Sequence, residues 1–253
     1  MAFDVPAEAY DRFMGRYSTL LSAPFAYFAG VHPGQRALDV GCGPGALTAE
    51  LVRRLGAEAV AAVDPSPPFV LAARERHPQV DVREAVAEDL PFPDSSFDIA
   101  LAQLVVHFMS DPLVGLGEML RIVRPGGIVA ATVWDFAGEH SPLSVFWRAA
   151  RAIDPDVRDE SLLAGAQEGG LSELFTAVGF HDVTETSLEI SVQHSDFEEW
   201  WAPYTGGVGP AGFYFSSLAS EEQDALQERC RTMLPDGPFT LVSRAWAARG
   251  VVA

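Results

Sequence analysis

Between about Gln35 and Trp134, short apolar runs that favour β-structure alternate with segments of helical periodicity. This alternation is typical of βαβ units and predicts an α/β fold around a parallel sheet. The run over residues 57–63 is almost entirely apolar, as expected of a strand that is buried on both faces. Five strands are predicted in this region, over Arg36–Val40, Ala57–Val63, Val80–Val86, Phe97–Gln103 and Ile128–Trp134.

Local signals place helices and turns between these strands. The helix after the first strand is expected to end at Gly56, because glycine adopts the conformations that close a helix. Ser66-Pro67 is an N-cap followed by a first helical residue, and Asp111-Pro112 begins a further helix in the same way. Arg124-Pro125-Gly126-Gly127 predicts a turn before the fifth strand.

The second half of the chain is organised differently. It predicts a sheet platform with two helical inserts near one end. Its expected elements are helices and loops over residues 136–168, a helix over Leu171–Val178 closed by Gly179, a strand over Asp182–Val192, a helical and aromatic stretch over residues 195–238, and a last strand over Phe239–Ala247.

Charge and cysteine content restrict the partners. The 17 basic and 35 acidic residues give a net charge of −18, which disfavours a nucleic-acid substrate and an anionic membrane surface. Cys42 and Cys230 are the only cysteines, so no disulfide framework is expected. Without a signal-peptide pattern or an apolar run of about 18 residues, a cytoplasmic location is expected. No spacing of His, Cys, Asp and Glu indicates a metal site.

A glycine-rich segment follows the first predicted strand, at residues 39–45 (DVGCGPG). A strand, a glycine turn and a helix place backbone N–H groups at the carboxyl edge of a parallel sheet, where α/β folds bind ligands. Gly41, Gly43 and Ala46 also satisfy a loose dinucleotide fingerprint. Asp64, at the end of the second strand, can accept hydrogen bonds from a ribose in either NAD or S-adenosylmethionine. These residues alone indicate a cofactor that contains adenosine, and they do not distinguish NAD from S-adenosylmethionine.

Four segments in order resemble the motifs of class I S-adenosylmethionine-dependent methyltransferases, especially the small-molecule subgroup that includes ubiquinone-biosynthesis enzymes. They are residues 37–45 (ALDVGCGPG), 63–66 (VDPS), 88–98 (EDLPFPDSSFD) and 120–127 (LRIVRPGG). The resemblance implies a Rossmann-like, doubly wound, seven-stranded and mostly parallel sheet, with the last strand antiparallel and helical inserts forming a cap. It also implies in-line methyl transfer from S-adenosylmethionine to a small apolar or aromatic molecule, with S-adenosylhomocysteine as product.

The expected organisation combines the pattern of elements along the chain with this resemblance. It comprises an N-terminal helical lid (1–34), a cofactor-binding core (35–135), a helical insert (136–170), a core helix and strand (171–194), an aromatic and helical cap insert (195–238), and the final strand with the C-terminus (239–253). Two other functions remain open at this stage. They are a catalytically silent S-adenosylmethionine-binding regulator and an NAD-dependent oxidoreductase.

The resemblance also implies a cofactor site. Asp39 and the glycine loop would hold the methionine part together with Gln103, and Asp64 would take the ribose hydroxyls. Tyr10 would cover the cofactor and Arg16 would pair with its carboxylate, unless this N-terminal run is only a surface helix. The full set is Tyr10, Arg16, Asp39, Gly41, Cys42, Gly43, Asp64, Pro65, Phe69, Ala87, Glu88 and Gln103.

The adenine contacts depart from the family pattern at one position. Phe69 would pack on the adenine face and Ala87 would offer its backbone N–H. The family commonly has Asp where this chain has Val86. Glu88 either replaces that carboxylate or faces solvent.

Catalytic and acceptor-binding candidates come from histidines and aromatic residues. His107 follows the fourth strand and is the candidate general base, because its ordinary pKa suits deprotonation of an acceptor; a structural role is the alternative. His32, His77, His181 and His194 are expected on the surface. Aromatic residues of the inserts predict an apolar acceptor wall, unless they form only the inserts' own core. The acceptor set is Trp134, His140, Trp201, Tyr204 and Tyr214.

Overall fold

The computed structural model describes residues 5–253, so the first four residues of the expected 1–34 lid lie outside the described residues. One seven-stranded sheet has the order β3-β2-β1-β4-β5-β7-β6. Strands β1 to β5 are parallel, and β7 runs antiparallel to both of its neighbours. The predicted fold class is confirmed. The strands are β1 (Ala37–Val40), β2 (Val60–Asp64), β3 (Asp81–Glu84), β4 (Phe97–Gln103), β5 (Val123–Trp134), β6 (His181–His194) and β7 (Phe239–Val251).

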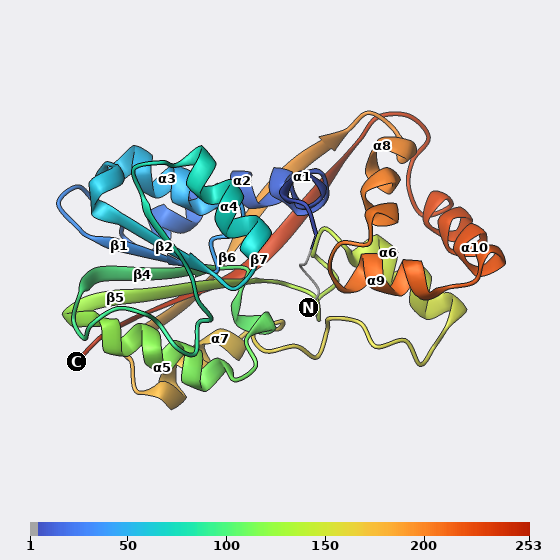
Figure 1. The fold of residues 1–253 in the computed structure, drawn as a ribbon. Coiled ribbons are helices and arrows are strands. Elements are labelled where there is room, and N and C mark those ends of the chain that lie inside the picture. Colours follow the sequence, from blue (N-terminus) through green and yellow to red (C-terminus); the bar gives the residue numbers. More distant parts are fainter. Residues whose placement is uncertain (1–4) are drawn as a thin grey trace.

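Helices cover both faces of the sheet (Figure 1). One face carries α2 (Arg16–Phe28), α3 (Ala46–Leu55) and α4 (Pro67–Arg76), and the other carries α5 (Pro112–Ile122) and α7 (Gly170–Val178). Each face has its own apolar core: Phe25 and Leu51 lie in one, Leu116 and Phe175 in the other, and all four are fully buried. Burying each such side chain contributes about 1.5–3 kcal/mol, so the sheet is held from both sides.

A second lobe lies beyond the carboxyl ends of the parallel strands (Figure 1). The long strands β6 and β7 reach out to it from the sheet, and α6 packs against α10 within it. Its elements are α6 (Ser144–Ile153), α8 (Phe197–Trp201), the short helix η4 (Ala202–Gly206), α9 (Gly209–Ser217) and α10 (Ser220–Arg231). The remaining short elements are α1 (Ala7–Tyr10), the π-helical turn η1 (Asp11–Gly15), and the 3₁₀ turns η2 (Ala57–Ala59) and η3 (Val106–Phe108).

Two local predictions were wrong in detail. The second strand begins at Val60, because the chain leaves α3 through Gly56 (φ +85°) and makes a short turn before it enters the sheet. Residues 124–127 form a bulge inside β5 rather than a turn before it. Phe97 pairs with Val123, whereas the next pair joins Ile99 to Ile128. The bulge leaves the sheet order unchanged.

Candidate functional site

The glycine loop is pressed against the ends of its neighbouring strands. The N–H groups of Gly41 and Cys42 both donate to the carbonyl of Val63, over 2.8 and 2.9 Å. Gly41 has φ +70°, and a Cβ on it would lie only 2.4 Å from a methyl group of Val105. A larger residue at Gly41 would therefore displace the loop from the edge of the sheet.

Asp64 joins this loop to the one after β2. Its carboxylate accepts hydrogen bonds from the backbone N–H groups of Gly43, at 2.8 Å, and of Ser66, at 2.9 Å. The side chain is buried, and burial raises the pKa of Asp64 to about 6 although both N–H groups oppose the shift. The carboxylate thus stands at the carboxyl edge of the sheet, fixed by backbone donors.

Two buried side chains near the loop have polar atoms without partners. Asp39 accepts a 2.6 Å hydrogen bond from the Thr48 hydroxyl through Oδ2, but Oδ1 has no partner among the described residues. Gln103 donates from Nε2 to the carbonyl of Ser18 at 3.1 Å, and its Oε1 is likewise unpaired there. Burial raises the pKa of Asp39 to about 7. Unpaired buried acceptors are costly, so they point to a ligand that carries donors.

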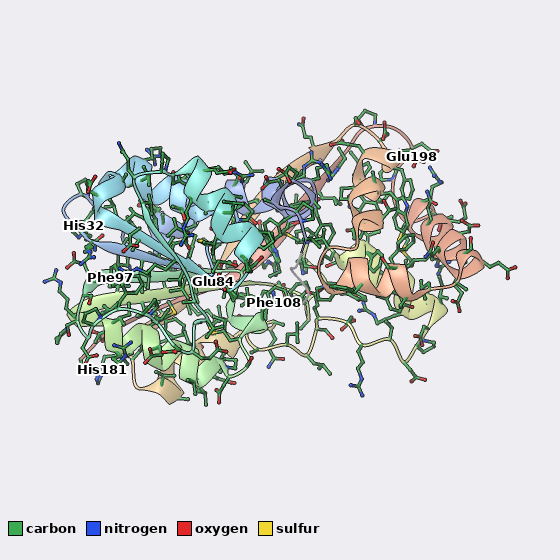
Figure 2. All side chains as sticks on the ribbon, in the orientation of Figure 1. His32, Glu84, Phe97, Phe108, His181 and Glu198 are labelled. Atoms are coloured by element: carbon green, nitrogen blue, oxygen red, sulfur yellow. The ribbon has the colours of Figure 1, made fainter. Side chains whose placement is uncertain are left out.

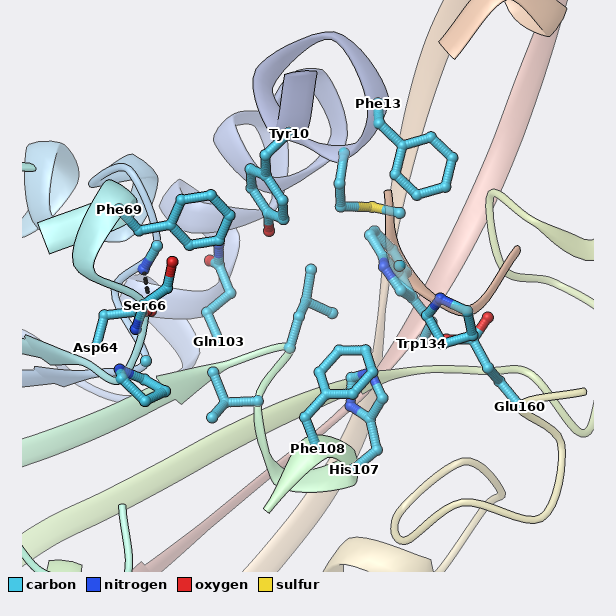
Figure 3. Close-up of a pocket in the computed structure, with 18 of the residues that line it drawn as sticks. Tyr10, Phe13, Asp64, Ser66, Phe69, Gln103, His107, Phe108, Trp134 and Glu160 are labelled. Carbon is cyan, nitrogen blue, oxygen red and sulfur yellow. Dashed lines mark hydrogen bonds between the residues drawn. The ribbon is translucent and has the colours of Figure 1, made fainter. Parts of the chain in front are cut away.

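A cavity of about 340 Å³ runs along this edge of the sheet. Figure 3 shows Asp64 and Phe69 on one side of it, Trp134 and Glu160 on the other, and Gln103 between them. A second hollow of about 250 Å³ shares Tyr10, Gly41 and Gln103 with the cavity. It is lined as well by Asp39, Cys42, Arg76 and His77. The two spaces therefore adjoin each other at the glycine loop.

The N-terminal segment closes over both spaces. The ring of Tyr10 packs on that of Phe69 with 5.1 Å between centroids. Asp11 pairs with Arg76 at 2.5 Å, and Arg76 also donates to the carbonyl of Pro44 in the glycine loop, at 3.1 Å. These contacts hold the segment against α4 and the glycine loop.

His107 lies on the wall of the cavity. Its side chain is buried, its ring packs on Phe108 with 3.9 Å between centroids, and Nδ1 has no partner among the described residues. Burial lowers the pKa of His107 to about 3, because the charged imidazolium is poorly solvated there. The imidazole is therefore neutral at physiological pH.

Most of the predicted cofactor residues come together here. Nine of the twelve line the cavity or the adjoining hollow: Tyr10, Asp39, Gly41, Cys42, Gly43, Asp64, Pro65, Phe69 and Gln103. Ala87 and Glu88 are not among the lining residues, and the carboxylate of Glu88 accepts from the N–H of Ser110, at 2.6 Å, ahead of α5. Arg16 lies elsewhere and pairs with Glu199 at 2.7 Å.

Of the predicted acceptor residues, only Trp134 lines the cavity. His140 is exposed and lies 3.3 Å from Asp135. The remaining aromatics pack among themselves in the second lobe: Tyr204 stacks on Phe146 at 4.8 Å, Trp201 stacks on Tyr204 at 5.6 Å, and Tyr214 contacts Trp147 at 5.8 Å. Of the residues in the 195–238 insert, Gly209 and Pro210 line the cavity.

Of the four histidines expected on the surface, His32 and His181 are exposed (Figure 2), whereas His194 is buried and His77 is partly buried. His194 is buried, and its Nε2 is hydrogen-bonded to the Tyr17 hydroxyl at 3.0 Å. His77 is half-buried against Gly45 and lines the second hollow. Each of these two histidines contacts a residue that is distant in the sequence, and the local sequence pattern does not predict such contacts.

Sequence reasoning missed one carboxyl group in the cavity wall. Glu160 lies in the loop between α6 and α7, is 3% exposed, and accepts a 2.8 Å hydrogen bond from Trp147 Nε1. Burial raises its pKa to about 7. The surrounding residues 154–169 have no periodicity or motif, so no sequence signal separates Glu160 from the acidic residues on the surface.

Comparisons with known proteins agree with this geometry. The family described as "Methyltransferase domain" matches residues 38–131. An uncharacterized methyltransferase of Mycobacterium sp. (strain KMS) is 36% identical over 188 residues, covering 69% of this chain and 70% of that protein. Malonyl-[acyl-carrier protein] O-methyltransferase of Pectobacterium atrosepticum is 37% identical over 148 residues, covering 58% of this chain. The matched part spans only 56% of that enzyme's length.

A solved structure shares the fold. Phosphoethanolamine N-methyltransferase 2 of Haemonchus contortus, in complex with phosphomonomethylethanolamine and S-adenosylhomocysteine, superposes with a TM-score of 0.59 at 17% identity. The alignment covers 98% of the present chain and 57% of the other. The chain belongs to the class I S-adenosylmethionine-dependent methyltransferases. It is an enzyme whose cofactor is S-adenosylmethionine.

Two features are absent from residues 5–253. No helix there has the length and apolar character needed to cross a membrane. No group of three or more His, Cys, Asp and Glu side chains in that range is arranged to hold a metal ion.

Proposed function

We propose that the protein methylates a small apolar or aromatic molecule, which binds in the cavity between Trp134 and the cofactor. The observation that carries this proposal is the continuity of the cavity. One space extends from Asp64 and Phe69 to a wall built of Trp134, Phe136 and Leu143. Such a wall suits an apolar acceptor, and the cavity has room for a small molecule beside the cofactor.

The residues present fit S-adenosylmethionine. Asp64 would accept from the ribose hydroxyls and Phe69 would pack on adenine, with Pro65 beside them. The unpaired Oδ1 of Asp39 and Oε1 of Gln103 would receive the donors of the methionine ammonium. Tyr10 would cover the ligand, because it already spans both spaces.

Catalysis then needs mainly alignment and exclusion of water. S-adenosylmethionine supplies a methyl group on a sulfonium sulfur, which leaves readily by in-line displacement. The protein would hold the acceptor in the apolar half of the cavity, under the lid formed by Tyr10 and the second lobe. A base is required only where the acceptor must lose a proton.

His107 is suited to orienting the acceptor. With a pKa of about 3, its imidazole is a weak base, but its neutral form can accept a hydrogen bond at Nδ1. We therefore assign His107 the task of positioning an acceptor O–H or N–H. Arg16 and Glu88 hold other partners in the structure, so we assign neither to the cofactor.

A methyl-transfer screen tests the proposal. The protein is incubated with methyl-labelled S-adenosylmethionine and a panel of small aromatic and aliphatic acceptors, and acceptor-dependent S-adenosylhomocysteine is measured. The proposal predicts turnover with at least one neutral or cationic apolar compound. Tight cofactor binding with transfer only to proteins or nucleic acids would contradict the small-molecule assignment.

A further inference from the structure

The end of the cavity farthest from Asp64 holds a carboxyl group without a charged partner (Figure 3). One oxygen of Glu160, Oε2, accepts the hydrogen bond from Trp147 Nε1. The other, Oε1, accepts no hydrogen bond from any residue in the described part of the chain. The side chain is 3% exposed, so it is too deeply placed for bulk water to solvate it fully.

The surroundings of Glu160 are aromatic and contain no fixed positive charge. Trp134 lies on the same side of the cavity as Glu160 (Figure 3), and the lining also includes Phe136, Leu143 and Pro210. No arginine or lysine is among the described residues that line the cavity, and its only histidine, His107, is neutral. The nearby Arg151 is already paired with Asp159.

This arrangement is complementary to a cation. A carboxylate in an apolar setting needs an opposite charge or several hydrogen-bond donors. Aromatic faces attract organic cations as well. An anionic group at this end would lie beside the Glu160 carboxyl group, with no arginine or lysine among the described lining residues to compensate its charge. The raised pKa of Glu160 in the free protein agrees with a missing cationic partner.

We propose that Glu160 is a specificity-determining residue that selects an acceptor carrying a protonated amine on an apolar or aromatic body. The inference rests on the proposed function, because it takes this cavity to be the acceptor site. The ammonium group would lie between the Glu160 carboxylate and Trp134, while the body of the acceptor extends toward His107 and the cofactor.

The test uses three probes of almost the same shape: 2-phenylethylamine, 2-phenylethanol and phenylacetate. Their dissociation constants are measured by ligand-observed NMR on protein saturated with S-adenosylhomocysteine. The proposal predicts that the wild-type protein binds the amine at least about tenfold more tightly than the alcohol, and phenylacetate most weakly.

Two variants complete the test. Glu160→Gln keeps the shape of the side chain and an oxygen for Trp147 but removes the charge, so the preference for the amine should disappear. Glu173→Gln, on the exposed side of α7, is the matched control and should retain it. Both variants should bind S-adenosylhomocysteine as the wild type does, which shows that the fold and cofactor site are intact.

The outcomes separate the two claims. If wild-type protein fails to bind S-adenosylhomocysteine, the assignment of the cofactor cavity is wrong. If it binds S-adenosylhomocysteine but binds the alcohol or phenylacetate as tightly as the amine, or binds none of the probes, the inference about Glu160 is overturned. It is overturned equally if Glu160→Gln keeps the wild-type preference.

Discussion

The carboxylate of Asp64, at the end of β2, accepts a 2.8 Å hydrogen bond from the backbone N–H of Gly43 in the loop after β1. One side chain thereby sets the distance between the two loops that border the cavity. Its other oxygen is bonded to the Ser66 N–H at 2.9 Å. The acid proposed to bind the ribose therefore also organises the glycine loop.

Replacing Asp64 with Asn should weaken binding of S-adenosylhomocysteine about tenfold to a hundredfold, as expected when a charged acceptor is lost. An amide has one acceptor oxygen, so either the Gly43 or the Ser66 N–H also loses its partner. Isothermal titration calorimetry measures the change. Asp81→Asn, on an exposed Asp of β3, is a matched control that should leave affinity unchanged. Equal affinities for wild type and Asp64→Asn would refute the ribose assignment.

Cofactor binding should depend on pH through Asp39. Burial raises the pKa of this carboxyl to about 7 in the free protein, so it is mostly protonated below that pH. If the carboxylate receives the methionine ammonium, the affinity is constant above about pH 8 and falls as pH decreases below 7, by up to about tenfold per unit. Titrations between these pH values test this, and an affinity that does not change would argue against the contact.

Asp39→Asn should weaken the cofactor complex but stabilise the free protein at pH 8. Because the folded pKa lies above the unfolded value of 3.8, the stability associated with this group is fully present below about pH 4. It is lost as pH rises to about 7. Asn removes the buried charge and keeps an oxygen for Thr48. Urea unfolding at pH 8 should give a higher free energy of unfolding for the variant; a lower one would contradict this linkage.

The aromatic residues of the second lobe should matter for stability more than for specificity. Phe146 is fully buried and stacks on Tyr204, so Phe146→Ala should lower the free energy of unfolding by about 3–5 kcal/mol. Tyr204→Phe retains the stack and should leave stability and acceptor preference close to the wild type. A change of acceptor preference in Tyr204→Phe would show that its hydroxyl reaches the acceptor after all.

The ring of Tyr10 should contribute to cofactor retention. It packs on Phe69 and lines both spaces, so Tyr10→Ala should raise the dissociation rate of S-adenosylhomocysteine several-fold by removing cover from the ligand. Tyr10→Phe preserves the ring and is the control. Stopped-flow fluorescence follows the release, and identical rates for Ala and Phe variants would exclude a role for the ring as a cover.

The sequence suffices to predict that most residues proposed for the cofactor lie close together, because these residues follow strand ends. Asp39, Asp64 and Gln103 belong to three different strands, and a parallel sheet brings such positions to one edge. The helix start at Asp111 is equally local, since its side chain accepts from the N–H of Leu113 at 3.0 Å. Signals of this kind act over a few residues and do not depend on the tertiary fold.

The part of the cavity that we propose for the acceptor could not be predicted in the same way. Glu160 reaches the cavity because its irregular loop is held by the hydrogen bond to Trp147. Gly209 and Pro210 line the cavity because α9 begins beside it. The aromatic side chains of the cap insert pack against one another. Their abundance in the sequence therefore indicates a hydrophobic core as readily as the wall of a binding site. The pairing of Arg16 could not be predicted for a related reason: its partner, Glu199, is 183 residues away in the sequence.

A crystal structure of the protein with S-adenosylhomocysteine would show where the cofactor binds. We expect the ribose at Asp64, adenine against Phe69, the amino acid part at Asp39 and Gln103, and the sulfur facing the space in front of Trp134 and Glu160. A ligand whose sulfur faces away from that space, or whose ribose lies apart from Asp64, would contradict this expectation.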